Sequence, residues 1–385
     1  MYRKTYIEIN TSNLKDNIKN IVDNYRGYKY YIGVVKGNVY GHGYESIKYL
    51  IESGINYLAT STLEEAIKIR ELYQNIPIMC LQPIHIDDVS IAISNDIAIT
   101  ISDYLYFKNL ININLSKGVK FHLKINSGLN RLGISDMNQV LDIINFSKNN
   151  SFIKIEGIYS HFATTGIYEK HWDDQLERFR NITSLVDLNE IPMVHLGRSL
   201  TLLNHDKIDI VNAVRLGAVM YGYYTTSLKQ TGIKAFFREI KRKIYTVLFN
   251  ISKTNRIIKG KFKSCLSLYS EIIEIKQIKK GEYIGYGSYY QTKSNIYTGI
   301  VSIGYADGFL RGNNGGYVFI NSKKYKIIAV DMGMLIVTID NTVKLYDRVE
   351  IIGDNISAND LARRNSTTVY EILCAFKESI PRVLK

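Results

Sequence analysis

The sequence has 385 residues, which is long enough for two domains or for one large barrel with a further domain. Hydrophobic residues make up 46% of the chain, which supports a packed core and excludes a disordered protein. The formal net charge is +13, but lysines and acidic residues alternate over most of the chain, so a solvated basic surface is favoured over nucleic-acid binding.

The apolar segments and the cysteines predict where the protein works. No uncharged apolar run reaches the roughly 18 residues that a membrane span needs. The N-terminal residues Met1–Ile9 lack the apolar core of a signal peptide and are typical of a strand. We therefore expect a cytoplasmic protein with no membrane partner. Cys80, Cys265 and Cys374 are odd in number and far apart, which predicts buried thiols rather than disulfides or a metal site.

Short apolar runs recur in the first 220 residues and alternate with segments of helical periodicity. The sets Leu63/Ala66/Ile67/Ile69 and Val140/Leu141/Ile143/Ile144 have helical spacing. This alternation predicts a (β/α)8 TIM-like barrel over residues 11–225. The predicted strands are Tyr30–Val35, Tyr57–Thr60, Ile76–Leu81, Ile97–Ile101, Phe121–Ile125, Ile155–Tyr159, Met193–Leu196 and Val214–Met220.

Polar residues fall where the predicted barrel strands end. Lys36 follows the first strand, Lys124 lies in the fifth, and His161 follows the sixth. Ser199 follows the seventh and Arg215 lies in the eighth. Barrel enzymes carry their catalytic groups at the C-terminal ends of strands, so these positions predict an active site there.

The pattern changes after about Thr225, where turn-punctuated strands replace the alternation with helices. We expect residues 226–385, together with the strand in residues 1–10, to form a mainly-β domain. A last helix is predicted at Ser357–Arg363, capped by Ser357. The predicted strands are Leu266–Ile275, Ile296–Ile303, Tyr317–Ile320, Tyr325–Val330, Leu335–Ile339 and Arg348–Ile352.

The segment Val34-Val35-Lys36-Gly37-Asn38-Val39-Tyr40-Gly41-His42-Gly43 carries the strongest chemical signal. A lysine directly after a buried strand is expected to be buried, and burial lowers an amine's pKa and suits it to forming a Schiff base. Three glycines let the backbone turn sharply near a ligand. By spacing alone, a strained loop with an incidental lysine explains the segment equally well.

This segment resembles the cofactor-lysine signature of the alanine racemase family, whose members use pyridoxal 5′-phosphate (PLP). Further segments resemble motifs of that family in the same order along the chain. They are residues 124–133, Gly157-Ile158-Tyr159-Ser160-His161-Phe162-Ala163, Val214-Arg215-Leu216-Gly217 with Tyr221-Gly222, Gly285-Tyr286-Gly287, Gly304-Tyr305-Ala306-Asp307-Gly308 and Tyr370-Glu371-Ile372-Leu373.

The resemblance implies a homodimer with shared active sites that interconverts L- and D-alanine and supplies D-alanine for peptidoglycan. Lys36 would bind PLP and act as one acid/base, and Tyr286 of the other subunit would be the opposite base. Racemisation removes a proton from one face of Cα and returns it on the other, so two flanking groups meet its needs.

The resemblance also implies which residues bind the cofactor. Arg215 would face the pyridine nitrogen, and His161 would link Arg215 to Tyr286 by hydrogen bonds. A guanidinium hardly ever gives up a proton, so the ring nitrogen would stay unprotonated and side reactions would be discouraged. The phosphate would bind to Tyr40, Ser199, Gly217, Ala218 and Tyr370.

The substrate-binding residues follow from the same resemblance. Arg131 would contact the substrate carboxylate, and Tyr305, Val330 and Asp331 would line the substrate pocket. Lys124 matches a family position that is often a carbamylated lysine, whose negative charge would orient Arg131.

Several residues depart from the family pattern. Val330 replaces a methionine, Arg198 replaces an asparagine and Asn126 replaces an aspartate. The segment Thr225–Lys263 is longer than usual, and its stretch Arg238–Lys263 holds nine basic residues and one acidic residue without an assigned role. A serine or broad-specificity racemase, a PLP decarboxylase or aldolase, and a non-catalytic PLP carrier or nucleic-acid binder remain alternatives.

Overall fold

The computed structural model describes residues 3–115, 117–164, 170–224 and 262–385, together with five isolated positions between residues 237 and 248. The long segment from Thr225 and its basic run Arg238–Lys263 therefore lie largely outside the described residues.

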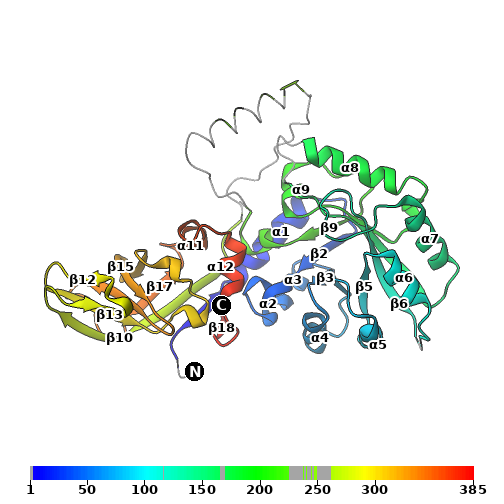
Figure 1. The fold of residues 1–385 in the computed structure, drawn as a ribbon. Helices are drawn as coiled ribbons and strands as arrows, with labels where there is room; N and C mark the ends of the chain where they lie inside the picture. The colour runs from blue at the N-terminus through cyan, green and yellow to red at the C-terminus, as the bar shows by residue number, and fades with distance from the viewer. Residues whose placement is uncertain are drawn as a thin grey trace.

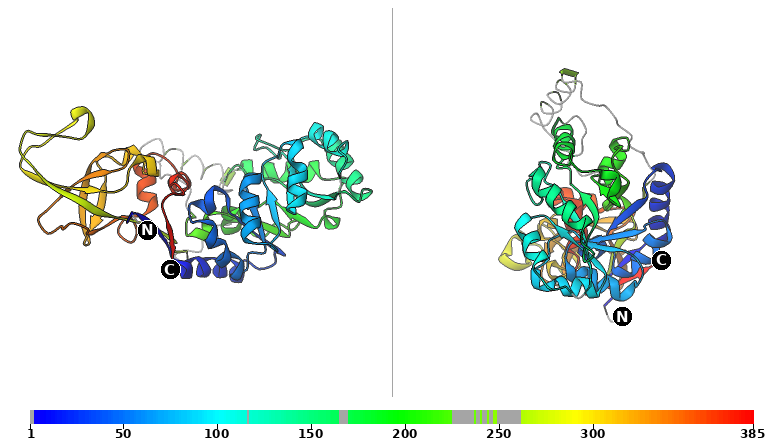
Figure 2. Two further views of the ribbon diagram at one scale, coloured as in Figure 1. Left: turned by 90° about the horizontal axis from the view of Figure 1, so that it is seen from below. Right: turned by 90° about the vertical axis from the view of Figure 1, so that its right-hand side faces the viewer.

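Eight parallel strands form the first sheet, in the order β8-β7-β6-β5-β4-β3-β2-β9, with helices on its outside (Figures 1 and 2). A parallel bridge between Arg198 and Arg215 brings the chain after β8 against β9 and closes the ring. This confirms the predicted (β/α)8 barrel. The strands are β2 (Tyr30–Val34), β3 (Tyr57–Thr60), β4 (Ile78–Cys80), β5 (Ile97–Ile101), β6 (Val119–Lys124), β7 (Ile153–Tyr159), β8 (Met193–His195) and β9 (Ala213–Leu216).

The predicted strand Val214–Met220 is too long. Strand β9 ends at Leu216, and a 3-10 helix, η4, follows at Ala218–Tyr221. All four residues of η4 are buried, as strand residues would be. A short buried helix and a buried strand give the same unbroken apolar run, so the sequence could not separate them.

Helices cover the outside of the barrel, and several begin at a side-chain cap. Thr62 and Glu65 form a reciprocal capping box at the start of α4, and Asp136 caps α7. These two helices are the ones that the apolar spacing predicted. The helices of this part are α1 (Thr11–Asn24), α2 (Lys36–Tyr40), α3 (Ile47–Glu52), α4 (Leu63–Leu72), α5 (Val89–Ser94), α6 (Tyr104–Ile111), α7 (Met137–Lys148), α8 (Lys170–Ile182) and α9 (Ser199–Asn204).

The second sheet is mainly antiparallel and also closes on itself, because the long strand β10 pairs at one end with β17 and at the other with β13. A β-bulge between Ile272 and Glu274 lets β10 bend between these partners. The N-terminal strand β1 lies between β10 and β18. The main strands are β1 (Tyr6–Ile9), β10 (Leu266–Ile278), β13 (Ile296–Val301), β14 (Tyr317–Ile320), β15 (Lys323–Val330), β16 (Leu335–Ile339), β17 (Arg348–Ile352) and β18 (Arg382–Leu384), with the short pair β11 (Tyr283–Ile284) and β12 (Tyr290–Gln291).

Helix α11 (Ala358–Arg364) is capped by Ser357 as predicted, but it is not the last helix. A further helix, α12 (Val369–Ala375), follows it and lies against the barrel (Figure 1). The contact is close: a Cβ on Gly41 would lie 2.1 Å from the carbonyl oxygen of Leu373. Arg382 also donates from Nε to the Gly41 carbonyl at 3.1 Å. The C-terminal segment therefore completes one side of the barrel mouth.

The cysteines differ from the prediction in one case. Cys80 and Cys265 are buried, but Cys374 of α12 is exposed, because its side chain faces the barrel opening. Among the residues described, no helix combines the length and the apolar character needed to cross a membrane.

Candidate active site

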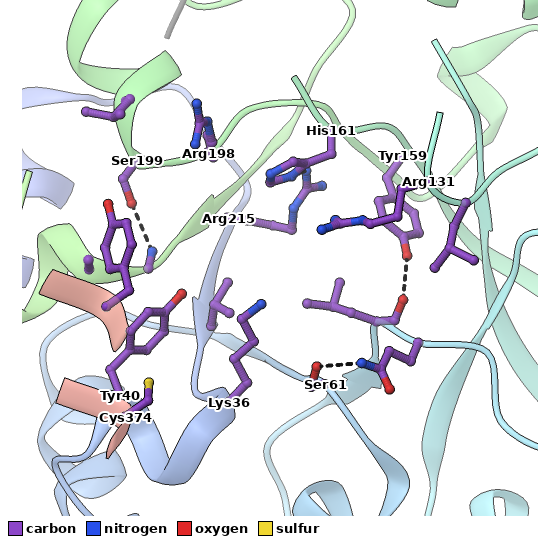
Figure 3. A pocket seen from close by; sticks show the side chains of 18 of the residues that line it. Lys36, Tyr40, Ser61, Arg131, Tyr159, His161, Arg198, Ser199, Arg215 and Cys374 are labelled. Atoms are coloured by element: carbon purple, nitrogen blue, oxygen red, sulfur yellow. Dashed lines mark hydrogen bonds between the residues drawn. The ribbon is translucent and has the colours of Figure 1, made fainter. Parts of the chain in front are cut away.

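A cavity of about 420 Å³ lies at the C-terminal ends of the barrel strands. Figure 3 shows Lys36, Arg131 and Arg215 reaching toward the same space from different segments. Five lysine and arginine side chains line the cavity, and no aspartate or glutamate is among its described lining residues. The site is therefore built for an anionic ligand. It contains every barrel and α12 residue that the sequence predicted: Lys36, Tyr40, Lys124, Arg131, His161, Ser199, Arg215, Gly217, Ala218 and Tyr370.

The backbone after Lys36 is left-handed over several consecutive residues. Gly37, Asn38, Val39 and Tyr40 have φ of 64°, 50°, 58° and 51°. A positive φ costs a non-glycine residue roughly 1–2 kcal/mol, and a β-branched valine tolerates it least. This turn is strained, and only the surrounding contacts can hold it.

Two sets of contacts hold the left-handed turn. The Glu65 carboxylate accepts the backbone N–H of Gly37 at 2.6 Å and that of Ser61 at 2.9 Å, which ties the turn to the start of α4. Nδ1 of His42 lies 3.0 Å from the Val39 carbonyl oxygen, and the His42 ring stacks on the ring of Tyr221 with 4.4 Å between their centroids. Burial lowers the pKa of His42 to about 4, so this histidine is a neutral structural group.

The turn brings the Tyr40 hydroxyl to the loop after β9. A Cβ on Gly217 would lie 3.0 Å from that hydroxyl and 3.9 Å from Ser199 Oγ, so a glycine keeps this corner open. Ser199 Oγ accepts the Gly217 N–H at 2.9 Å. The ring of Tyr370 approaches that of Tyr40 edge-on at 6.1 Å. Hydroxyls and backbone N–H groups therefore converge at one end of the cavity.

Arg215 forms part of the cavity wall and is only 3% exposed. Its guanidinium donates to the carbonyls of Ser160 (2.6 Å), His195 (2.9 Å) and Leu196 (3.2 Å). It also donates to Nδ1 of His195 at 2.5 Å and to Nδ1 of His161 at 3.3 Å. Because a guanidinium only donates, both of these Nδ1 atoms must be unprotonated. The remaining proton of neutral His161 is then on Nε2.

His161 stays neutral for a physical reason. Burial, followed by the charges of Arg215 and Arg198, holds its pKa well below the usual range. Arg198, which replaces the expected asparagine, lines the same cavity and donates to the Thr164 carbonyl at 2.9 Å. The replacement of the asparagine by Arg198 thus adds a cation to the cavity wall, and the side chain does not turn away from the cavity.

Lys124 is 5% exposed and lies among cations. Burial first, and then the charges of Arg215, Arg131 and Lys36, lower the pKa of Lys124 to about 8. Its Nζ lies 5.1 Å from the centre of the Tyr159 ring, which offers a cation–π contact. An amine in these surroundings is poised to lose its proton.

The structure places four predicted residues elsewhere. Tyr286, Tyr305, Val330 and Asp331 lie on the β-rich part of the chain and none of them lines the barrel cavity. They lie near one another: Tyr305 N–H donates to the Asp331 carbonyl at 3.0 Å, and a Cβ on Gly285 would lie 3.2 Å from Cβ of Ala329. Tyr286 is 85% exposed. One chain therefore carries two separate groups of predicted site residues.

The exposure of the Lys36 side chain differs from what the sequence predicted. The prediction that Lys36 is buried is wrong for the single chain, because its side chain is exposed to the open cavity.

Tyr159 and Cys374 line the cavity but were not predicted. Tyr159 ends β7, a position that could have signalled it, whereas Cys374 depends on the unexpected helix α12.

Family models match nearly the whole chain: "Alanine racemase, N-terminal domain" over residues 9–225 and "Alanine racemase, C-terminal domain" over residues 265–384. An alanine racemase of Borreliella burgdorferi (strain ZS7) is 33% identical over 380 residues, covering 96% of this chain and 94% of the relative.

Two solved structures show how far the similarity extends. The crystal structure of alanine racemase from E. faecalis has a TM-score of 0.88 at 26% identity, covering 100% of this chain and 99% of the other. Histidine racemase from Leuconostoc mesenteroides subsp. sake has a TM-score of 0.84 at 22% identity and covers 100% of this chain and 98% of its own, a likeness of fold alone. With its barrel, its cation-lined cavity and its two matched domains, the chain belongs to the alanine racemase family, a family of isomerases.

Proposed function

We propose that the protein is a PLP-dependent racemase that interconverts L- and D-alanine. The observation that carries this proposal is the cavity itself, in which Lys36 at a strand end faces a wall of cations and a corner of hydroxyl and N–H donors. A cavity of about 420 Å³ lies within the usual size range of cofactor sites.

The residues present fit PLP. The corner formed by Tyr40, Ser199, Gly217, Ala218 and Tyr370 offers donors to a phosphate, and barrel enzymes commonly bind phosphate after their last two strands. Lys36 is the exposed amine of the cavity and would hold the cofactor covalently. Bound PLP would withdraw electrons from the substrate α-carbon and make its proton acidic.

The acid–base work would fall on two residues of different subunits. The Lys36 amine would exchange the α-proton on one face, and the phenol of Tyr286 from a second copy would serve the other. The exposed position of Tyr286, remote from its own cavity, supports this sharing. The Nε2 proton of neutral His161 would be free to bond to Tyr286, and so link it to Arg215.

Arg215 and Arg131 would position the reactants. Arg215 would donate a hydrogen bond to the pyridine nitrogen and leave it unprotonated, because a guanidinium retains its protons. Arg131 would pair with the substrate carboxylate, and Tyr305, Val330 and Asp331 of the second copy would close the substrate pocket. We propose that residues 11–225 form the PLP-binding domain and that residues 226–385, with strand 1–10, form the domain that supplies these groups.

Substrate choice is tested by racemase assays across the proteinogenic amino acids. Alanine is expected to be the best substrate, because Tyr370 at the cavity restricts the space for a side chain. Turnover of serine or of a larger amino acid equal to that of alanine would refute the alanine assignment and favour a broad-specificity racemase. A cytoplasmic homodimer supplying D-alanine for peptidoglycan completes the proposal, with no role for nucleic acid.

Lys124 is expected to carry a carbamate. With a pKa of about 8, roughly a tenth of this amine is neutral and reactive at pH 7, against less than about a thousandth for an ordinary lysine. Replacing Lys124 with alanine should lower kcat/KM roughly tenfold, because the anion that orients Arg131 is lost, and acetate should restore part of the activity. A matched substitution of the surface residue Lys120 should have no effect. A bare amine at Lys124 in an intact mass spectrum would remove the carbamate from the proposal.

A further inference from the structure

A chain of polar side chains, buried except for the partly exposed Glu156, runs beneath the cavity through the barrel interior. It connects Arg215 of β9 to His195 of β8, His122 of β6 and Glu156 of β7, with Tyr57 of β3 beside it. Tyr57 is 2% exposed and both histidines are 0% exposed. Only Arg215 of this set lines the cavity. Buried polar groups are costly unless they are hydrogen-bonded, so such a chain is not a neutral way to fill a barrel.

The hydrogen bonds of this chain run in one direction. His195 Nδ1 accepts from Arg215, so neutral His195 carries its proton on Nε2. That Nε2 lies 3.0 Å from His122 Nδ1, which must then accept. Because its Nδ1 accepts, the ring proton of His122 is on Nε2, which lies 3.1 Å from the Tyr57 hydroxyl oxygen and 3.3 Å from Glu156 Oε2. Tyr57 donates to the same carboxylate oxygen at 2.6 Å. The Arg215 cation thus fixes the tautomers of His195 and His122, and the chain of hydrogen bonds ends at the Glu156 carboxylate.

The opposite direction conflicts with the Arg215 contact. If His122 donated from Nδ1, His195 would have to accept on Nε2 and carry its proton on Nδ1. That proton would meet a guanidinium N–H across 2.5 Å. The ionised Glu156 carboxylate opposes this reversal, because it can only accept from His122 Nε2 and because it holds the hydroxyl proton of Tyr57, the other group near that nitrogen.

The two ends of the chain carry opposite charges. Among the described residues, each hydrogen-bond acceptor of the Arg215 guanidinium is an uncharged carbonyl or imidazole, and burial lowers the pKa of Arg215 to about 10. Burial by itself raises the pKa of Glu156, but the hydrogen bonds from His122 and Tyr57 and the charge of Lys120 lower it, and its pKa lies below the usual value. Glu156 is therefore the anion at the far end of the chain.

We propose that Glu156 and His122 are positioning residues, which fix the tautomer of His195 and thereby the orientation of the Arg215 guanidinium toward the cofactor ring. This inference rests on the proposed function, in which Arg215 bonds to the pyridine nitrogen. Glu156 and His122, which lie outside the cavity, would then act through Arg215 to favour racemisation over side reactions of the cofactor.

The test compares Glu156→Gln with a matched change in the same polar core, Thr100→Val. Thr100 shares a 3.0 Å hydrogen bond with Tyr159 but does not belong to the chain from Arg215 to Glu156. A glutamine can donate to His122 as well as accept, so Glu156→Gln permits the reversed tautomers. Tyr57→Phe removes the hydroxyl that bonds to Glu156 and to His122 Nε2 but keeps the carboxylate, and it provides a milder variant if Glu156→Gln does not fold.

Histidine side-chain ¹⁵N NMR of the cofactor-free protein gives the first result, and the seven histidines of the chain keep the spectrum assignable. His195 is expected as the Nε2–H tautomer in the parent and in Thr100→Val, and as a mixture in Glu156→Gln. With PLP bound, the ratio of abortive transamination to racemisation should rise roughly tenfold in Glu156→Gln, less in Tyr57→Phe, and not in Thr100→Val.

Two outcomes would overturn the inference. In the first, Glu156→Gln and Tyr57→Phe change neither the His195 tautomer nor the ratio of transamination to racemisation. In the second, Thr100→Val changes them as much as Glu156→Gln does. Failure of the proposed function looks different. In that case the parent protein would show no PLP absorbance or racemisation, while the NMR measurement would still report on the chain of hydrogen bonds.

Discussion

Replacing Lys36 with alanine is expected to abolish both the covalent attachment of PLP and racemisation. The other lysine of the cavity, Lys124, is buried in β6 and cannot take over, whereas Lys36 is exposed to the cavity. Losing an acid–base group lowers rates by about 10²–10⁴, and losing the cofactor as well should bring kcat/KM below detection. The absorbance spectrum of the purified protein and a racemase assay measure the two effects.

A surface lysine provides the control for this experiment. Nζ of Lys68 in α4 lies 3.8 Å from Glu378 Oε2, and Lys68 does not line the cavity. Lys68→Ala should therefore keep both the cofactor band and the activity. A cofactor band retained in Lys36→Ala would show that another group binds PLP. A parent protein that never shows the band would refute the PLP assignment itself.

Replacing Tyr286 with phenylalanine is expected to leave PLP bound but to lower racemisation by about 10²–10⁴. The loss should be greater in one direction, from L to D or from D to L, than in the other, because the phenol serves only one face of the α-carbon. Initial rates from each enantiomer and the cofactor absorbance give the measurement. Tyr289→Phe is a close control, since Tyr289 lies three residues away and is 92% exposed. Equal residual rates from both enantiomers would contradict the two-base assignment.

Mixing the two inactive variants tests whether the site is shared. A chain with Lys36→Ala still supplies Tyr286, and a chain with Tyr286→Phe still supplies Lys36. If sites combine both subunits, a 1:1 mixture that exchanges at random should recover about one quarter of the parent activity, since half the dimers are mixed and each has one intact site. No recovery in demonstrably mixed dimers would place both bases in one chain.

Much of the barrel could be predicted from the sequence, because its parallel strands are buried on both faces and read as continuous apolar runs. β5 is an example, with all five residues buried and both ends predicted correctly. β9 shows the limit, because Ala218–Tyr221 is equally apolar but helical. Helix α12 was missed although Thr368 caps it, and with it the position of Cys374 at the cavity.

The sequence by itself determined the family, the fold class and the set of barrel residues around Lys36, because these depend on local motifs and on strand-end positions. Only the tertiary structure decided how these residues are held. The left-handed turn after Lys36 depends on Glu65 of another helix, and the low pKa of Lys124 depends on cations from several segments. Likewise, Tyr57, His122, Glu156 and His195 form a directed chain only because four strands meet inside one barrel. Such contacts join residues far apart in the sequence, and the pattern of any one segment carries no signal of them.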